Sequence, residues 1–218
     1  MNDSASDQAV ASTAVHKAPG SDDGPDGVRR RARAAIEAAL AGVEASFEQP
    51  ADGHYVVSLP GTHKLNTACS LLLGDHTLSV NAFVVRHADE NQEAVYRWLL
   101  ERNARLAGIA FALDRLGDVY LVGRIPLAAV TETAVDQVLG AVLDAADSSF
   151  DTLLELGFAG SIRREWEWRL KRGESTANLA AFERLRPDVP SAASDGSDAD
   201  GTDLDNRDSG GTDPDVTR

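Results

Sequence analysis

Few side chains in this sequence are of the types that do chemistry, and those few are scattered. The central part offers four histidines and a lone cysteine as metal ligands or nucleophiles: His54, His63, Cys69, His76 and His87. No two of them have the close helical or hairpin spacing of a known metal site. His63 and His76 stand near the starts of predicted strands and could meet across a hairpin, but surface imidazoles beside turns are the simpler interpretation. The sequence predicts no metal site and no cofactor.

Cys69 stands in the middle of the most apolar predicted strand. A nucleophilic thiol needs a base and an electropositive setting, and nothing in the sequence indicates either. We therefore expect Cys69 to be a small buried core residue. A single cysteine also excludes an internal disulfide and a multi-cysteine zinc site, which is typical of a protein of the reducing cytoplasm.

Acidic side chains recur at three- and four-residue steps along the longest predicted helix, as Asp144 with Asp147 and Asp151 with Glu155. Like charges at this spacing repel, so we interpret them as the solvated side of the helix. No set of nucleophile, base and orienting group can be proposed, and the sequence has no glycine-rich phosphate loop. The sequence favours a protein that is not an enzyme. An enzyme that uses scattered residues is the third hypothesis, after the protein-binding module and the ligand-sensing regulator described below.

Four arginines between residues 29 and 33 form the main basic cluster, and Arg163 with Arg164 forms a smaller one. They could contact an anion or nucleic acid, line a solvated helix face, or receive the Asp-rich C-terminal segment folded back on them. The solvated face is favoured, because the chain carries a net charge of −14 and affinity for nucleic acid comes largely from neutralising phosphates. Nucleic acid is therefore not an expected partner.

The negative charge is concentrated at the two ends of the 218-residue chain. Residues 1–27 have a net charge of −4 and residues 187–218 a net charge of −7, and neither segment contains an aromatic residue. Such segments bury too little apolar surface to offset the entropy lost on ordering. We expect disordered tails at 1–27 and 187–218 around a single domain at 28–186. No apolar run approaches the roughly 20 residues of a membrane span, and no secretory signal is visible, so we expect a cytoplasmic protein.

Hydrophobic periodicity predicts the elements of this domain. A helix begins near Val28, and a second starts at residues 89–91 and ends near Gly108. A long helix runs from Thr131 or Thr133 to Gly157. The remaining predicted segments are strands at 55–59, 65–73, 76–85, 109–113 and 119–125, a helix at 161–172 and short amphipathic turns at 178–185. The order α-β-β-β-α-β-β-α-α indicates an α+β fold, an antiparallel sheet with helices packed against it.

The second face of this sheet is also apolar at several positions: Ala68, Leu72, Phe83, Val85, Tyr120 and Val122. Either a helix covers each side of the sheet, or one exposed patch makes a dimer or peptide surface. Trp166 and Trp168 pose a related question, because residues two apart on a helix point about 200° apart. One tryptophan can enter the core, while the other is an interface anchor unless residues 173–185 cover it.

Five stretches of the chain together resemble the YbjN family, and the actinobacterial branch is especially similar. They are Val95–Leu106, Ala110–Asp114, Gly117–Arg124, Leu154–Phe158 and Arg164–Trp168. The likeness covers about residues 30–185 and not the long acidic tails. The family is described as bacterial sensory-transduction regulators, and its fold is similar to that of type III secretion chaperones.

The resemblance implies a small acidic α+β protein, usually dimeric, that holds an extended segment of a partner. It supplies no catalytic residues, and a fold likeness does not establish a secretion role. We therefore expect a non-enzymatic cytoplasmic protein-binding module, a homodimer, with Leu72, Tyr120 and Trp168 as partner-contact residues. The alternative is a regulator that senses a small ligand in a pocket between the sheet and a helix.

Overall fold

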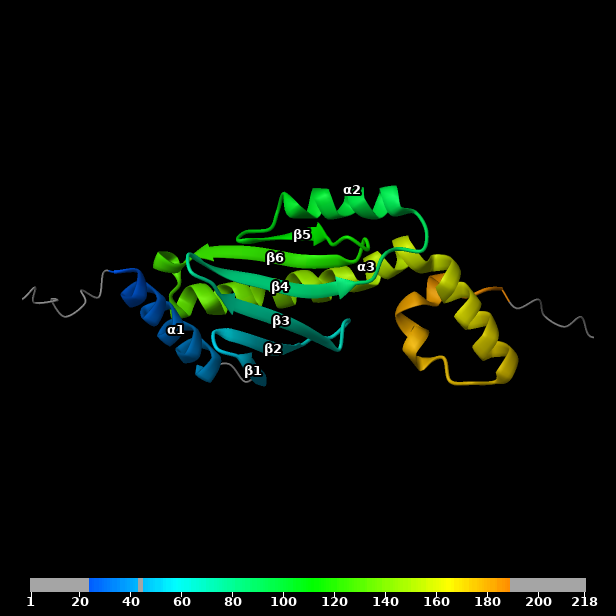
Figure 1. Ribbon diagram of the computed structural model, residues 1–218. Helices are drawn as coiled ribbons and strands as arrows, with labels where there is room; N and C mark the ends of the chain where they lie inside the picture. The colour runs from blue at the N-terminus through cyan, green and yellow to red at the C-terminus, as the bar shows by residue number, and fades with distance from the viewer. Residues whose placement is uncertain (1–23, 43–44, 189–218) are drawn as a thin grey trace, which may run out of the picture. The chain divides into compact units, whose positions relative to one another are not determined.

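A six-stranded antiparallel sheet, in the order β1-β2-β3-β4-β6-β5, carries the long helix α3 on one of its faces (Figure 1). The computed structural model describes residues 24–42 and 45–188, so the two predicted tails lie almost wholly outside the described residues. The elements are α1 (Pro25–Gly42), β1 (Phe47–Ala51), β2 (His54–Pro60), β3 (Asn66–Leu73), β4 (Thr77–Val85), α2 (Gln92–Asn103), β5 (Ile109–Leu113), β6 (Val119–Pro126), the 3-10 turn η1 (Leu127–Ala129), α3 (Glu132–Arg172) and the 3-10 segment η2 (Ala177–Leu185). This arrangement confirms the α+β class.

The core lies between the sheet and the helices, and the strands alternate as a one-sided sheet must. In β4 the side chains of Leu78, Val80 and Ala82 are buried, while those of Ser79 and Asn81 point to the opposite face. Figure 1 shows α3 running behind the sheet, and α3 packs against β2, β3, β4 and β5. The alternation predicted from the sequence therefore divides the sheet into a helix-covered face and an open face.

The long helix begins and bends where the sequence indicates. The Thr131 hydroxyl accepts a hydrogen bond from the Ala134 N–H at 3.1 Å, which is an N-cap. The helix continues past the predicted stop at Gly157 to Arg172, but Phe158 has non-helical backbone angles (φ −141°, ψ 17°). At this bend the Gly157 carbonyl accepts hydrogen bonds from the Asp89 and Glu90 N–H groups, at 2.9 and 3.1 Å. Contacts with the link before α2 thus divide α3 into two halves.

β1 was not among the predicted elements, because no strand was expected between the first helix and residue 55. β1 contains Pro50 and is nevertheless paired, with Phe47 opposite Val57 and Glu48 opposite Val56. It is an edge strand, and its register with β2 shifts between Glu48 and Ala51; both edge strands and irregular positions tolerate a proline without an N–H. Its five residues are all exposed, so it shows no apolar alternation.

Val85 was expected on the second face of the sheet, and that expectation is wrong. The register between β4 and β6 shifts after Phe83, so that Val85 pairs with Val119 while Val84 has no partner. A bulge of this kind turns successive side chains toward the same side. Val84 and Val85 are both buried, at 0% and 6% exposure.

No helix among the described residues is long and apolar enough to cross a membrane.

Candidate functional site

The open face of the sheet is accessible to solvent, because none of the helices described within residues 24–42 and 45–188 packs on it. Strand register aligns its side chains in rows across the sheet. One row joins Leu72, Ser79 and Arg124, and another contains the pair Phe83 and Tyr120. The open face is hereafter the outward side chains of β2, β3, β4, β6 and β5: His54, Val56, Ser58, Asn66, Ala68, Ser70, Leu72, Thr77, Ser79, Asn81, Phe83, Tyr120, Val122, Arg124, Ala110 and Ala112.

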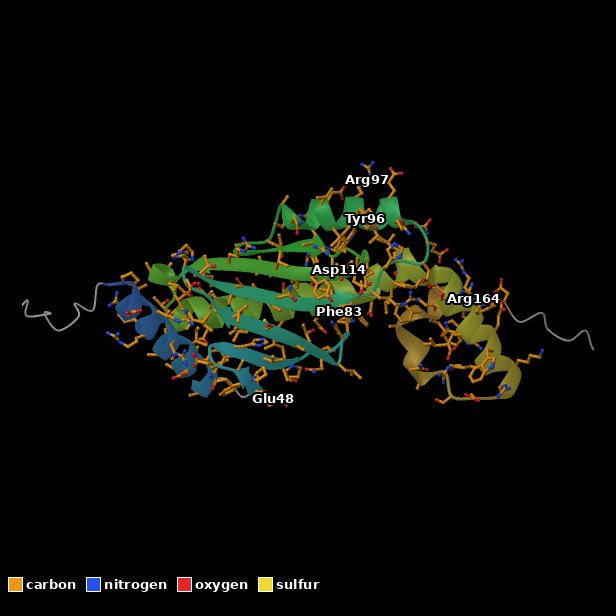
Figure 2. All side chains as sticks on the ribbon, in the orientation of Figure 1. Glu48, Phe83, Tyr96, Arg97, Asp114 and Arg164 are labelled. Atoms are coloured by element: carbon orange, nitrogen blue, oxygen red, sulfur yellow. The ribbon has the colours of Figure 1, made fainter. Side chains whose placement is uncertain are left out.

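Two large apolar side chains on this face are exposed to solvent. Leu72 is 49% exposed and Phe83 is 41% exposed. The rings of Phe83 and Tyr120 meet edge to face, with centroids 5.5 Å apart; Figure 2 labels Phe83 on β4. The expected contact residues Leu72 and Tyr120 therefore lie on the same face, two strands apart.

Trp168 lies on the second half of α3 and not on the open face. It is 43% exposed, and the Arg172 guanidinium lies 4.9 Å from its ring centroid. Trp166 is 1% exposed, and its indole N–H donates to the Phe182 carbonyl at 3.3 Å. η2 thus covers Trp166 and leaves Trp168 accessible. Of the two tryptophans, Trp166 is therefore the one that enters the core.

The acids on α3 were interpreted as a solvated side, and this is wrong for three of the four. Asp147 Oδ1 accepts hydrogen bonds from the backbone N–H groups of Thr62, His63 and Lys64, at 2.9, 2.8 and 2.9 Å. We call this arrangement the Asp147 clamp. Burial raises the pKa of Asp147, but the three N–H bonds outweigh it and leave the pKa below its ordinary value. The clamp fixes the β2–β3 loop to α3.

The neighbouring acids extend this docking. Asp151 Oδ2 lies 2.6 Å from His63 Nδ1, and Glu155 pairs with Arg184 of η2. Asp144 alone of the four fits the predicted solvated side, because it is exposed. Sequence spacing showed these acids sharing a helix but gave no sign of the distant segments that they bind.

The basic cluster on α1 also has structural partners. Arg29 pairs with Asp75 at 2.9 Å, in the β3–β4 turn, and Arg33 binds both carboxylate oxygens of Asp52, at 2.5 and 2.8 Å, in the β1–β2 turn. The guanidinium of Arg33 lowers the pKa of Asp52. These two arginines therefore tie α1 to sheet turns and are not simply a solvated face. The proposed contact with the Asp-rich C-terminal segment lies outside the described residues.

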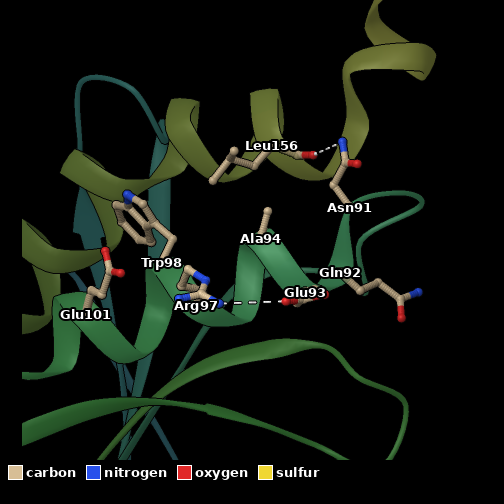
Figure 3. A pocket seen from close by; sticks show the side chains of 8 residues that line it. All are labelled: Asn91, Gln92, Glu93, Ala94, Arg97, Trp98, Glu101 and Leu156. Carbon is tan, nitrogen blue, oxygen red and sulfur yellow. Dashed lines mark hydrogen bonds and ion pairs between the residues drawn. The ribbon is translucent and has the colours of Figure 1, made fainter.

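A cleft of about 620 Å³ lies between α2 and α3 (Figure 3). The Asn91 side chain donates to the Leu156 carbonyl at 3.2 Å, and Glu93 is 3.7 Å from Arg97, its ion-pair partner. Trp98 lines the same cleft and packs against Phe111, with ring centroids 6.2 Å apart. These side chains are engaged in contacts within the protein, and the residues that line the cleft include no nucleophile beside a base.

The predicted chemical candidates do not converge. Cys69 is 0% exposed, and burial raises the pKa of its thiol to about 12, so it carries no thiolate near neutral pH. His63 belongs to the β2–β3 loop, whereas His76 precedes β4 at the β3–β4 turn, and they are not brought together. In the part of the chain that the structure describes, no three His, Cys, Asp or Glu side chains are grouped to hold a metal ion.

The structure is thus an α+β domain with one helix-covered and one open sheet face. Residues 32–155 match the YbjN family, whose description is "Putative bacterial sensory transduction regulator". This match spans more than half of the chain, and the chain belongs to the YbjN family.

Similar proteins are found in mycobacteria, as the expected actinobacterial branch requires. An uncharacterized protein of Mycobacterium tuberculosis is 55% identical over 138 residues, which cover 63% of this chain and 75% of that protein. One of Mycobacterium leprae is 54% identical over 133 residues, which cover 61% of this chain and 72% of that protein.

Two solved structures are also similar. The crystal structure of the ExsC–ExsE complex matches with 24% identity and a TM-score of 0.41, covering 59% of this chain and 95% of the other. The structure of the HopA1–SchA chaperone–effector complex matches with 16% identity and a TM-score of 0.37, covering 52% and 85%.

Proposed function

We propose that this chain is a non-enzymatic cytoplasmic protein-binding module, chaperone-like or regulatory, that works as a homodimer and binds its partner on the open face of the sheet. One observation carries the proposal: α3 packs across the sheet on one face, while Leu72 and Phe83 are exposed and Tyr120 is half-buried on the other. Burying large apolar and aromatic side chains is the main source of affinity at protein interfaces.

The composition of the open face supports this role. The residues between its apolar side chains are small and uncharged, among them Ser70, Ser79 and Asn81. Interface cores are depleted in charged residues, which are costly to dehydrate. Arg124 at the end of β6 supplies a charge at the margin, where a rim contact stays hydrated. Trp168 is a second proposed contact point, away from the sheet.

The homodimer is proposed to form through the outer side of α2. Leu100 is 70% exposed there, beside Tyr96, which Figure 2 labels. A shallow cleft of about 630 Å³ runs along Tyr96, Arg97 and Leu100. Light scattering on the full chain tests this step, with an expected mass of twice 23.1 kDa. Leu100→Glu should give the monomer mass, and a wild-type monomer would remove the dimer from the proposal.

Partner binding is tested by cross-linking in the native cell, identification of the partner, and calorimetric titration of the purified proteins. Tyr120→Ala should weaken binding at least tenfold, because aromatic residues at the centre of interfaces cost about 2 kcal/mol or more when truncated. Arg163→Ala, at an exposed position on α3, is the matched control and should stay within twofold. Equal effects of the two substitutions would exclude the open face as the binding surface.

Ligand sensing is the second candidate function, and a specific feature favours it. A groove of about 510 Å³ lies between the end of β4 and the part of α3 around its bend, a volume within the usual range of small-molecule sites. A thermal-shift screen with metabolites tests this function, since a ligand that binds the native state raises its apparent stability. A screen without any stabilising compound would count against it.

A further inference from the structure

The groove between β4 and α3 has apolar walls from three elements. Its lining includes Phe83 of β4, Phe150, Leu154, Phe158 and Ile162 of α3, and Leu179 of η2. The bend of α3 at Phe158 helps to form it, because the second half of the helix leaves its straight course there. Phe158 itself is 5% exposed and forms part of the wall. We call this feature the Lys64 groove, after the cation at its rim.

Most charges around the groove are already neutralised. Arg86 lies 4.5 Å from the centroid of the Phe158 ring and binds both carboxylate oxygens of Asp89, at 2.7 and 2.8 Å. Glu165 accepts a hydrogen bond from Arg169 Nε at 2.6 Å. Neither the Arg86 guanidinium nor the Glu165 carboxylate is left to attract a ligand strongly.

Lys64 is different. Its ammonium lies 5.2 Å from the ring centroid of Phe83 and 6.0 Å from that of Phe150, and it donates to the Phe83 carbonyl. Within residues 24–42 and 45–188 no carboxylate pairs with it. Burial lowers the pKa of Lys64, which means that the charged form has lost part of its hydration. The aromatic rings compensate for only part of this loss.

The backbone holds Lys64 at this position. The Asp147 clamp binds the N–H of Lys64 itself and of the two residues before it. Gly61 permits this close approach, because a Cβ there would lie 2.4 Å from Asp147 Oδ1. The backbone that carries the Lys64 side chain is therefore held beside the apolar walls before any ligand arrives, and a preorganised site loses less entropy on binding.

We propose that the Lys64 groove binds a small apolar monocarboxylate, whose carboxylate pairs with the Lys64 ammonium and whose hydrocarbon part packs on Phe83, Phe150 and Ile162. A single charge without a carboxylate partner calls for a single anionic group, and the volume suits a small molecule rather than a protein segment. The proposal rests on the ligand-sensing function and names the chemical class of its ligand.

Calorimetry with octanoate, and with 1-octanol as its neutral analogue, tests the proposal on the full chain. Wild type should bind octanoate at least tenfold more tightly than octanol. Lys64→Gln keeps a polar side chain, one atom shorter, and removes the charge, so it should weaken octanoate binding about tenfold and leave octanol binding within twofold. Lys171→Gln, an exposed lysine outside the groove, is the matched control and should change neither affinity.

The possible results separate the proposal from the function on which it rests. Equal binding of octanoate and octanol, unaffected by Lys64→Gln, would overturn the carboxylate assignment and leave a neutral apolar ligand site. Binding of neither would overturn the assignment and count against ligand sensing. Amide NMR of the wild type keeps the site itself testable: octanoate should shift the resonances of Phe83 and Phe158, and shifts confined to other regions would refute the groove.

Discussion

Removing the Asp147 carboxylate should loosen the β2–β3 loop and destabilise the domain. In Asp147→Ala three backbone N–H groups lose their acceptor, at Thr62, His63 and Lys64. Because the loop is largely exposed, water replaces part of the loss. We therefore count about 1 kcal/mol for each bond, below the range for buried bonds to charged groups, and expect about 3 kcal/mol in total.

Thermal unfolding followed by circular dichroism measures this effect at pH 7. For a domain of this size about 1 kcal/mol lowers Tm by about 2–4 °C, so Tm should fall by about 6–12 °C. Asp144→Ala is the control, because Asp144 lies one turn earlier on the same helix and is exposed. It should change stability by less than about 0.5 kcal/mol. If both variants melt within about 2 °C of each other, the clamp does not stabilise the fold.

The pH dependence provides an independent check. The folded pKa of Asp147 lies below its ordinary value, so its contribution to stability is complete above the ordinary aspartate pKa of about 4 and is lost as the pH falls through the folded pKa. The stability difference between wild type and Asp147→Ala should therefore be constant from about pH 5 to 8 and shrink below about pH 4. A difference that persists unchanged at pH 2 would show that it does not come from the carboxylate.

Three further predictions follow from burial and close contacts. Gly61→Ala should destabilise the domain by about 1–3 kcal/mol in urea unfolding, because its Cβ would lie 2.4 Å from a carboxylate oxygen of Asp147. The control Gly140→Ala, whose Cβ would meet nothing within 4 Å, should be neutral or stabilising by up to about 1 kcal/mol. A larger loss of stability in Gly140→Ala than in Gly61→Ala would contradict the close approach at Gly61. Cys69 should react with a thiol reagent only after unfolding, since burial raises its pKa to about 12, and rapid labelling of the native protein would refute its burial. Trp166→Ala should cost about 3–5 kcal/mol and Trp168→Ala less than about 1 kcal/mol; similar losses would mean that η2 covers both.

Local sequence patterns were sufficient for most of the fold. The alternation of Leu78, Val80 and Ala82 with polar residues predicted β4 and its orientation, because a one-sided sheet imposes a period of two. Gly117, in the connection between β5 and β6, has a φ of 84°, a conformation that glycine adopts readily. Gly157 marked the point where α3 bends. Each of these signals resides in a few adjacent residues.

The missing parts depend on contacts between distant residues. β1 has no alternation to detect, because both of its faces are exposed, and the turn of Val85 into the core depends on a bulge opposite β6. The Asp147 clamp joins positions more than 80 residues apart. The Lys64 groove likewise draws on the β2–β3 loop, β4, α3 and η2, so no local pattern could have indicated it.

Site-specific photo-crosslinking tests the central claim, that the open face is a protein-binding surface. A benzophenone amino acid replaces Tyr120 in one variant and Arg163 in another, and cells that make the full chain are irradiated. Position 120 should give a discrete covalent adduct with another protein, and the adduct should be lost when Leu72→Asp is added. Position 163 should give none. No adduct at position 120, or the same adduct at both positions, would contradict the claim.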